Sequence, residues 1–257
     1  MRRLGAALLL AASPAAAEVP RADVVIIGEV HGNPAHHVNQ AEIVAGLAPA
    51  ALVFEMLLPE QAAAVTPALR DDAAALADAV DWEGRGWPDF AMYHPIFTAA
   101  PEASVHGGDW PRDEVRRAVS DGAAAVFGDG AARFGLDQPL PAQEQGRREA
   151  LQAAAHCDAL PEAMLPGMVE AQRLRDAALA QAALDAFEAA GGPVVVITGT
   201  GHARRDWGVP ALLGVAAPEL SVFSIGQFEV DPGPDAPFDR VIVTEQVERA
   251  DPCEAFR

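Results

Sequence analysis

The stretch VVIIGEVHGNPAHHVNQAEIVAGLAPAALVFEM, residues 24–56, decides the fold of this chain. Residues 24–27 form an apolar run of strand length, residues 34–47 have helical periodicity behind an initial proline, and residues 51–54 form a second apolar run. A strand, a helix and a second strand at this spacing are typical of a βαβ unit. The stretch therefore predicts an α/β fold, with a mainly parallel β-sheet flanked by helices.

Later segments extend the predicted sheet. Residues 194–198, 221–225 and 240–244 are predicted strands, and residues 103–106 are a weaker candidate. Residues 112–190 have helical periodicity and no convincing strand. We therefore expect this segment to form a smaller, mostly helical subdomain inserted between strands of the sheet.

The first 17 residues, MRRLGAALLLAASPAAA, place two arginines before an apolar run and end on small residues. This pattern is typical of a cleaved secretory signal peptide, so residues 18–257 are the predicted mature domain. The apolar run is shorter than the roughly 20 residues that a membrane span needs, and no cysteine near the cleavage site offers a lipid anchor. The sequence therefore predicts a periplasmic protein without a direct membrane span.

The chain is strongly acidic, with 37 acidic and 18 basic residues and a net charge of −19. Cleavage of the predicted signal peptide removes Arg2 and Arg3 and no acid, so the mature charge becomes −19 − 2 = −21. Nucleic acids and anionic membranes are also negatively charged and would be repelled. The negative net charge of the chain therefore argues against both as partners.

The two cysteines, Cys157 and Cys253, both lie in the predicted mature domain. In an oxidising compartment they are able to pair, which would fix the C-terminal tail to the body of the protein for about 2–4 kcal/mol. The alternative is two unrelated buried thiols, because geometry cannot be read from spacing. The chain contains no CxxC motif, which excludes a metal or haem-attachment pair of that kind.

Acids and histidines follow three of the predicted strands. Glu29 and His31 lie in GEVH, Glu55 comes directly after residues 51–54, and His202 ends the string TGTGH. Loops that leave the carboxyl ends of neighbouring parallel strands meet in one crevice, so we expect these four side chains to line one site. The alternative is a set of ordinary polar turns, with Glu55 held by backbone amides.

Two further histidines, His36 and His37, begin the predicted helix of residues 34–47. The positive end of the helix dipole favours neutral imidazole, which is the form that binds metals. The alternative is that one or both only cap the helix or face solvent.

Tyr93 is the only tyrosine in the chain, and it lies in an aromatic stretch with Trp87, Phe90 and Phe97. The residue types by themselves favour a packed side chain with a hydrogen-bonded hydroxyl. The functional alternative is an axial phenolate ligand of haem iron, with the neighbouring rings as an apolar wall.

Several strings occur in the order seen in ChaN-like proteins, the haem-binding uptake branch of the Tiki superfamily, which the chain resembles over nearly all of its mature length. They are GEVHGNPAHHVNQ, FEM, YHP, GDWPR, HC, AQRLRDAALA and TGTGH. The resemblance implies a large parallel-sheet domain with a smaller helical one. It also implies a secreted protein that binds haem for iron uptake, forms a homodimer, and has an outer-membrane haem receptor as a partner.

The resemblance also assigns residues to the haem. Tyr93 matches the family tyrosine and becomes the expected ligand of the haem iron, and His94 or His36 is expected opposite it or nearby. In so acidic a chain the haem propionates need local cations, for which the residues themselves offer Arg85, Arg112, Arg204 and Arg205. Of these, Arg112 and Arg204 lie beside the predicted site loops.

An alternative function uses the crevice as an enzyme. His31, His202 and Glu55 would bind a divalent metal, and Glu29 or Glu55 would act as general base in a protease-like or esterase-like hydrolase. A metal-free esterase that uses His31 with Glu55 is a variant of the same idea. The resemblance favours haem binding over this alternative, because the hydrolase leaves Tyr93 without a role.

Overall fold

The computed structural model describes residues 19–249 and 253–254, so the predicted signal peptide lies outside the described residues. One six-stranded sheet, with every neighbouring pair parallel, forms the centre of the molecule. Its strands are β1 (Val24–Glu29), β2 (Ala51–Phe54), β3 (Ser104–Gly107), β4 (Val194–Gly199), β5 (Val222–Phe228) and β6 (Arg240–Val243). The predicted α/β fold with a mainly parallel sheet is therefore confirmed.

The strand order is β3-β2-β4-β1-β5-β6, which puts β1 and β4 at the middle of the sheet. In the register between these two strands, Val24 faces Val194 and Glu29 faces Gly199. All six residues of each strand are buried, which explains why both appear in the sequence as nearly continuous apolar runs. Their carboxyl ends lie side by side.

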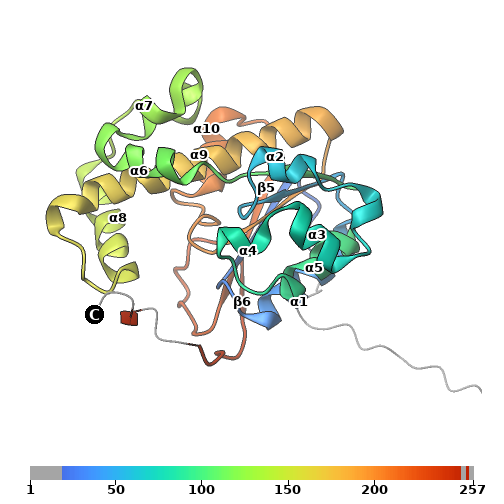
Figure 1. Cartoon of the computed structure of the whole chain (residues 1–257). Coiled ribbons are helices and arrows are strands. Elements are labelled where there is room, and N and C mark those ends of the chain that lie inside the picture. The colour runs from blue at the N-terminus through green and yellow to red at the C-terminus, as the bar shows by residue number, and fades with distance from the viewer. Residues whose placement is uncertain (1–18, 250–252, 255–257) are drawn as a thin grey trace, which may run out of the picture.

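Helices cover both faces of the sheet (Figure 1). The α-helices are α1 (Pro34–Leu47), α2 (Pro59–Ala63), α3 (Ala73–Ala79), α4 (Trp82–Arg85), α5 (Phe90–Ala99), α6 (Arg112–Asp121), α7 (Ala123–Phe127), α8 (Ala142–Ala155), α9 (Leu165–Ala190) and α10 (Val209–Ala216). The α1 helix begins where the sequence predicts, because Pro34 occupies its first turn and the Asn33 side chain accepts from the amide of Ala35.

Two hydrophobic cores lie on opposite faces of the sheet. Val24 and Ile26 of β1 pack with α9 and α10 in one core, and Val25 and Ile27 pack with α1 and α5 in the other. Successive side chains of a strand point to opposite faces, so a run of four apolar residues supplies both cores. This arrangement fixes the strand ends from two sides and holds their loops in place.

The segment of residues 112–190 contains helices α6 to α9 and, as predicted, no strand. Its last helix, α9, is 26 residues long and packs against β2, β3 and β4 as well as against α6 and α8. Side chains of α6, α7 and α9 also belong to the same hydrophobic core as one face of the sheet. The boundary of a separate subdomain stays a prediction, but α9 is clearly part of the layer that covers the sheet.

A disulfide joins Cys157, just after α8, to Cys253 in the C-terminal tail. Of the two alternatives for the cysteines, the structure therefore supports the paired one. None of the helices in the described part of the chain combines the length and the apolar character that a membrane span requires.

Candidate functional site

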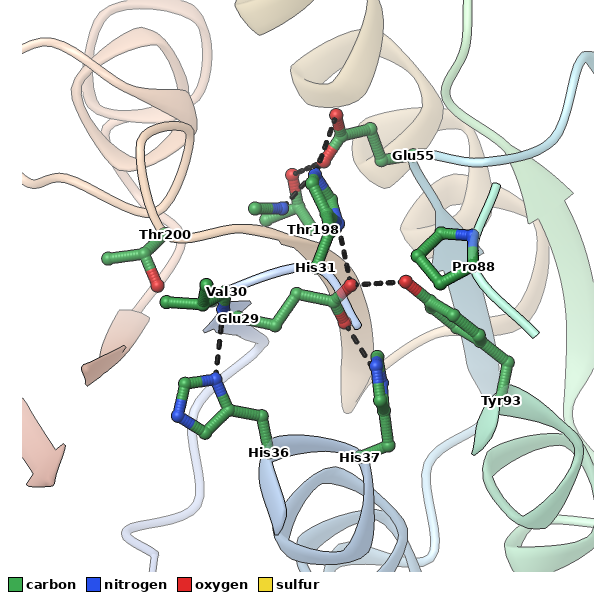
Figure 2. Close-up of polar contacts among 12 residues, drawn as sticks. Glu29, Val30, His31, His36, His37, Glu55, Pro88, Tyr93, Thr198 and Thr200 are labelled. Atoms are coloured by element: carbon green, nitrogen blue, oxygen red, sulfur yellow. Dashed lines mark hydrogen bonds and ion pairs between the residues drawn. The ribbon is translucent and has the colours of Figure 1, made fainter. Parts of the chain in front are cut away.

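The carboxyl ends of β1, β2 and β4 bring the predicted crevice residues together. Figure 2 shows Glu29, His31 and Glu55 of this set. Glu29 is the last residue of β1, Glu55 comes directly after β2, and His202 lies three residues after β4. His31, in the loop after β1, lies between the two carboxylates. The four side chains therefore lie together, as the sequence predicts.

Glu29 is buried and accepts three hydrogen bonds from side chains. Its Oε1 accepts hydrogen bonds from the hydroxyl of Tyr93 at 2.6 Å and from His31 Nδ1 at 2.7 Å. Its Oε2 accepts from Gln40 at 2.8 Å and lies 3.3 Å from His37 Nδ1. Burial opposes the charge of this carboxylate, but the hydrogen bonds from His31 and His37 lower the pKa of Glu29 to about 2. Glu29 is therefore a buried anion at neutral pH.

Glu55 is the second buried anion. Its Oε2 accepts from the hydroxyl of Thr198 at 2.7 Å and the amide of Gly199 at 2.6 Å, and its Oε1 accepts from Arg175 at 2.6 Å. Burial acts to raise the pKa of Glu55, yet the positive charges of His202 and Arg175 hold it well below its ordinary value. The sequence left open whether Glu55 is held by backbone amides or pairs with a side chain of the crevice. It does both, because it accepts from the amide of Gly199 and lies beside Arg175 and His202.

His202 provides a buried positive charge beside Glu55. Its Nδ1 donates to Asp176 at 2.6 Å, and its Nε2 lies 3.5 Å from Glu55 Oε1. Burial disfavours the protonated ring, but the charges of Glu55 and Asp176 raise the pKa of His202 to about 9. Burial also raises the pKa of Asp176.

His31 is where the network reaches solvent. Its side chain is 35% exposed, and its Nε2 lies 3.9 Å from Glu55 Oε1. Burial acts against protonation of His31, but the hydrogen bond to Glu29 raises its pKa overall. A Cβ atom at Gly199 would lie 3.0 Å from His31 Nε2, so the glycine at the end of β4 gives the ring its space.

Tyr93 belongs to this network and is completely buried, with 0% of its surface exposed. Its ring packs on His37 at 4.1 Å and on Trp82 at 4.7 Å between ring centres. Burial and the nearby charge of Glu29 raise the pKa of Tyr93, which keeps its hydroxyl protonated. Iron ligation by Tyr93 stays a prediction, and it would require loss of the hydrogen bond to Glu29 and exposure of the ring.

The other residues expected at the haem have separate partners. His36 Nδ1 accepts from the amide of Val30 at 2.9 Å, and burial lowers the pKa of His36, which favours the neutral ring. His94 Nε2 donates to the carbonyl of Arg70 at 2.6 Å. Arg112 is exposed and donates to the carbonyl of Arg85. None of these contacts involves the hydroxyl of Tyr93. The roles of His36, His94 and Arg112 at the haem stay predictions.

Two members of the network, Arg175 and Asp176, were not among the candidates from the sequence. Both lie on α9, far from the strands in sequence. Gln172 precedes them by one helical turn, and its side-chain amide lies 3.0 Å from His202 Nδ1. Polar residues three and four positions apart share one side of a helix, so the run AQRLRD contained a usable signal.

Among residues 19–249 and 253–254, no group of three or more histidine, cysteine, aspartate or glutamate side chains is arranged to hold a metal ion. Arg175 and His202 instead supply positive charge beside Glu55, at the place where the hydrolase alternative expects a metal.

An apolar pocket of about 340 Å³ adjoins this network between α8, α9 and the loop that follows β4. Its wall includes Gln172, whose side-chain amide lies beside His202, and Thr200, whose backbone amide donates to the carbonyl of Glu29. Its volume lies near the lower end of the range for small-molecule sites, about 300–1,000 Å³. It is lined by Arg148, Leu151, Gln152, Ala155, Val169, Gln172, Thr200, Gly201, Arg204, Trp207, Phe228 and Phe238.

Comparison with known families and structures gives one clear family match. Residues 15–213 match the family described as haem-binding uptake, Tiki superfamily, ChaN, and this range is more than half of the chain. No curated protein matches the chain.

Three solved structures match the chain. ChaN of Campylobacter jejuni, described as showing cofacial haem binding, is 17% identical over 86% of this chain and 87% of that one, with a TM-score of 0.65. The type III effector HopBA1 is 16% identical, with 88% of each chain covered and a TM-score of 0.46. A Bacillus cereus protein is 13% identical over 91% of this chain and 72% of that one, with a TM-score of 0.36. The first similarity supports the fold, and the other two are too weak to bear on function.

Proposed function

Because the chain belongs to the ChaN family of haem-binding uptake proteins in the Tiki superfamily, we propose that it binds haem and acts in haem uptake. The observation that supports this proposal within the chain is the pocket of about 340 Å³ beside the strand ends. Its wall combines the rings of Trp207, Phe228 and Phe238 with the guanidinium groups of Arg148 and Arg204. Haem has an apolar aromatic face and two carboxylates, and this wall offers partners for both.

Tyr93 is the proposed ligand of the haem iron. Coordination by Tyr93 needs the hydroxyl to leave Glu29 and the buried ring to reach solvent. We expect Tyr93→Phe to bind ferric haem more weakly and to lose the charge-transfer band of a tyrosinate ligand. The same affinity and absorption spectrum in Tyr93→Phe as in the unaltered protein would remove Tyr93 from the ligand role.

A charge introduced at the pocket mouth tests the location of the haem. Leu151 lines the pocket and is 46% exposed, so Leu151→Glu is expected to fold normally. A carboxylate there repels haem propionates and loses hydration when haem covers it, so we expect haem affinity to fall about tenfold or more. The measurement is a titration with ferric haem followed by ultraviolet-visible absorption. Val215→Glu, at a 62% exposed valine on α10, is the matched control and should bind haem like the unaltered protein. Equal affinities of both variants would place the haem elsewhere.

The proposal includes a periplasmic location, which rests on the predicted signal peptide of residues 1–17. It also includes a homodimer and an outer-membrane haem receptor as partner. Two haems bound face to face need a second protein surface, and the partly exposed Leu151 at the pocket provides apolar area for one. Sedimentation of the protein with and without ferric haem tests the dimer, and a haem-bound protein that stays monomeric would contradict it.

Hydrolysis in the crevice is a second candidate function, favoured by the buried charges around His31. Negatively and positively charged side chains lie together at the strand ends, and such clusters are common at catalytic sites. Glu29 orients His31, which points its other ring nitrogen toward Glu55, so His31 is placed to take a proton from water. Purified protein that contains no metal by elemental analysis and stays inactive toward ester and peptide substrates after zinc or manganese is added would count against the metal-dependent form.

A further inference from the structure

We propose that the pocket between α8, α9 and the loop after β4 is a binding site for a small aromatic monocarboxylate, a ligand of one or two rings that is distinct from haem. This inference goes beyond the proposed function, and binding of such an acid needs neither iron nor a tetrapyrrole. It depends on three features of the pocket, which are its size, the arginines at its wall and its aromatic lining.

The pocket suits a ligand smaller than haem. Its volume of about 340 Å³ lies near the lower end of the range for small-molecule sites, and a tetrapyrrole with its substituents needs more room. Among the described residues that line it there is no histidine, cysteine, methionine or tyrosine, the types that hold haem iron. Haem therefore reaches at most the mouth of the pocket, where Leu151 is exposed, and the enclosed space is left for a different ligand.

Positive charge is concentrated at one side of this pocket. All 18 basic residues of the chain are arginines, against 37 acids. Three of them lie over the ring of Trp207, with the guanidinium carbons of Arg204, Arg148 and Arg147 at 4.0, 5.3 and 5.6 Å from its centre. Such a group of cations in so acidic a protein indicates an anionic ligand, and arginine pairs well with carboxylates because its donors match their geometry.

Two of these arginines line the pocket and keep donors for an anion. Arg148 is only 8% exposed, its Nη2 donates to Glu144, and its buried Nε has no hydrogen-bond partner in the described part of the chain. Arg204 binds both oxygens of Asp206 through Nε and Nη2, which leaves the donors of Nη1. A buried donor without a partner is costly, so a carboxylate placed against Arg148 would stabilise this wall.

The rest of the lining suits a flat ring with a single carboxylate. Phe228 and Phe238 pack edge to face with 5.4 Å between ring centres, and Trp207 supplies a third ring. An aromatic ligand packs against such rings in offset or edge-to-face contacts. Because Arg148 and Arg204 lie over the same ring, Trp207, the cations form one group, which matches one carboxylate at one end of the ligand.

The experiment compares 2-naphthoate with 2-naphthamide by isothermal titration calorimetry on the purified protein. The two probes have the same rings and nearly the same shape, and only the acid is charged. We expect 2-naphthoate to bind saturably with a dissociation constant below about 1 mM, and 2-naphthamide to bind at least about tenfold more weakly. Arg204→Gln and Arg148→Gln should each weaken binding of the acid about tenfold and leave binding of the amide nearly unchanged.

Arg133→Gln is the matched control. Arg133 also lies over an aromatic ring, 6.0 Å from the centre of Phe134, and beside an acid, 3.6 Å from Glu188, but it is not part of the pocket. This variant should bind both probes like the unaltered protein. Arg204 is partly exposed, so Arg204→Gln keeps the test valid if the buried change at Arg148 impairs folding.

Three outcomes would overturn the inference. They are no saturable binding of 2-naphthoate below about 1 mM, equal binding of the acid and the amide, and unaltered binding of the acid by Arg204→Gln. A separate titration with ferric haem distinguishes the inference from the proposed function. Haem binding without 2-naphthoate binding would reject the inference alone, and 2-naphthoate binding without haem binding would support the inference while the proposed function fails.

Discussion

Replacing Glu55 with leucine is expected to lower the free energy of unfolding by about 3–5 kcal/mol, because it removes the carboxylate that pairs with Arg175 and one of the two acids beside the buried His202. Arg175 and His202 both lie beside this carboxylate, and within the described part of the chain Arg175 forms an ion pair with no other acid. The change also removes the acceptor for the hydroxyl of Thr198 and the amide of Gly199. Each unsatisfied buried donor adds to the cost.

Urea unfolding at neutral pH, followed by circular dichroism, measures this effect. Glu60→Leu makes the same chemical change at an exposed position of α2 and should alter the free energy of unfolding by less than about 0.5 kcal/mol. A stable Glu55→Leu protein, with a loss no larger than that of Glu60→Leu, would mean that water or a rearranged acid neutralises Arg175 and His202. The stability of the fold would then not depend on the ion pairs of Glu55 with Arg175 and His202.

The free energy of unfolding is expected to fall as the pH rises from about 6.5 to about 9, as a consequence of the pKa of His202. The folded protein holds the proton of this ring up to a pKa of about 9, while the ordinary value of 6.5 applies after unfolding. Protonation therefore stabilises the folded state fully below pH 6.5, and this contribution disappears as the pH passes the folded pKa. A difference of this size corresponds to a loss on the order of 3 kcal/mol.

Unfolding curves at a series of pH values, compared with those of His202→Gln, isolate this contribution. The variant should be less stable below pH 6.5 and should show a much flatter decline toward pH 9. His106→Gln is the control, because burial lowers the pKa of His106 and its loss cannot remove an alkaline decline. An unchanged slope in His202→Gln would show that another group holds the titrating proton.

Much of the sheet could be predicted because three of its strands, β1, β2 and β4, are fully buried. Residues 51–54 and Pro34–Leu47 have the predicted bounds in the structure, since an apolar run ends at Glu55 and a proline opens the helix. The predicted strand of residues 221–225 instead extends through Phe228, because Gly226 and Gln227 pair with β6 and are buried despite being poor strand formers.

The sequence could predict only those residues of the site that come directly after strands. Glu29, Glu55 and His202 could be placed together because parallel strand ends meet at one edge of a sheet. The spacing in AQRLRD puts Gln172 and Asp176 on one side of the α9 helix, but the place where that side meets the sheet depends on packing between distant segments. The surroundings of Tyr93 were also beyond the sequence, since a lone tyrosine does not identify the carboxylate, Glu29, that accepts its hydrogen bond.

The disulfide has a consequence for proteolysis. Cys157 and Cys253 are 96 positions apart, and the backbone between them includes α9, β4, α10, β5 and β6. A single cut anywhere between the two cysteines produces two fragments that remain covalently joined until the bond is reduced. A nicked molecule therefore migrates as one intact chain in a denaturing gel without reductant, and the cut appears only when a thiol is added.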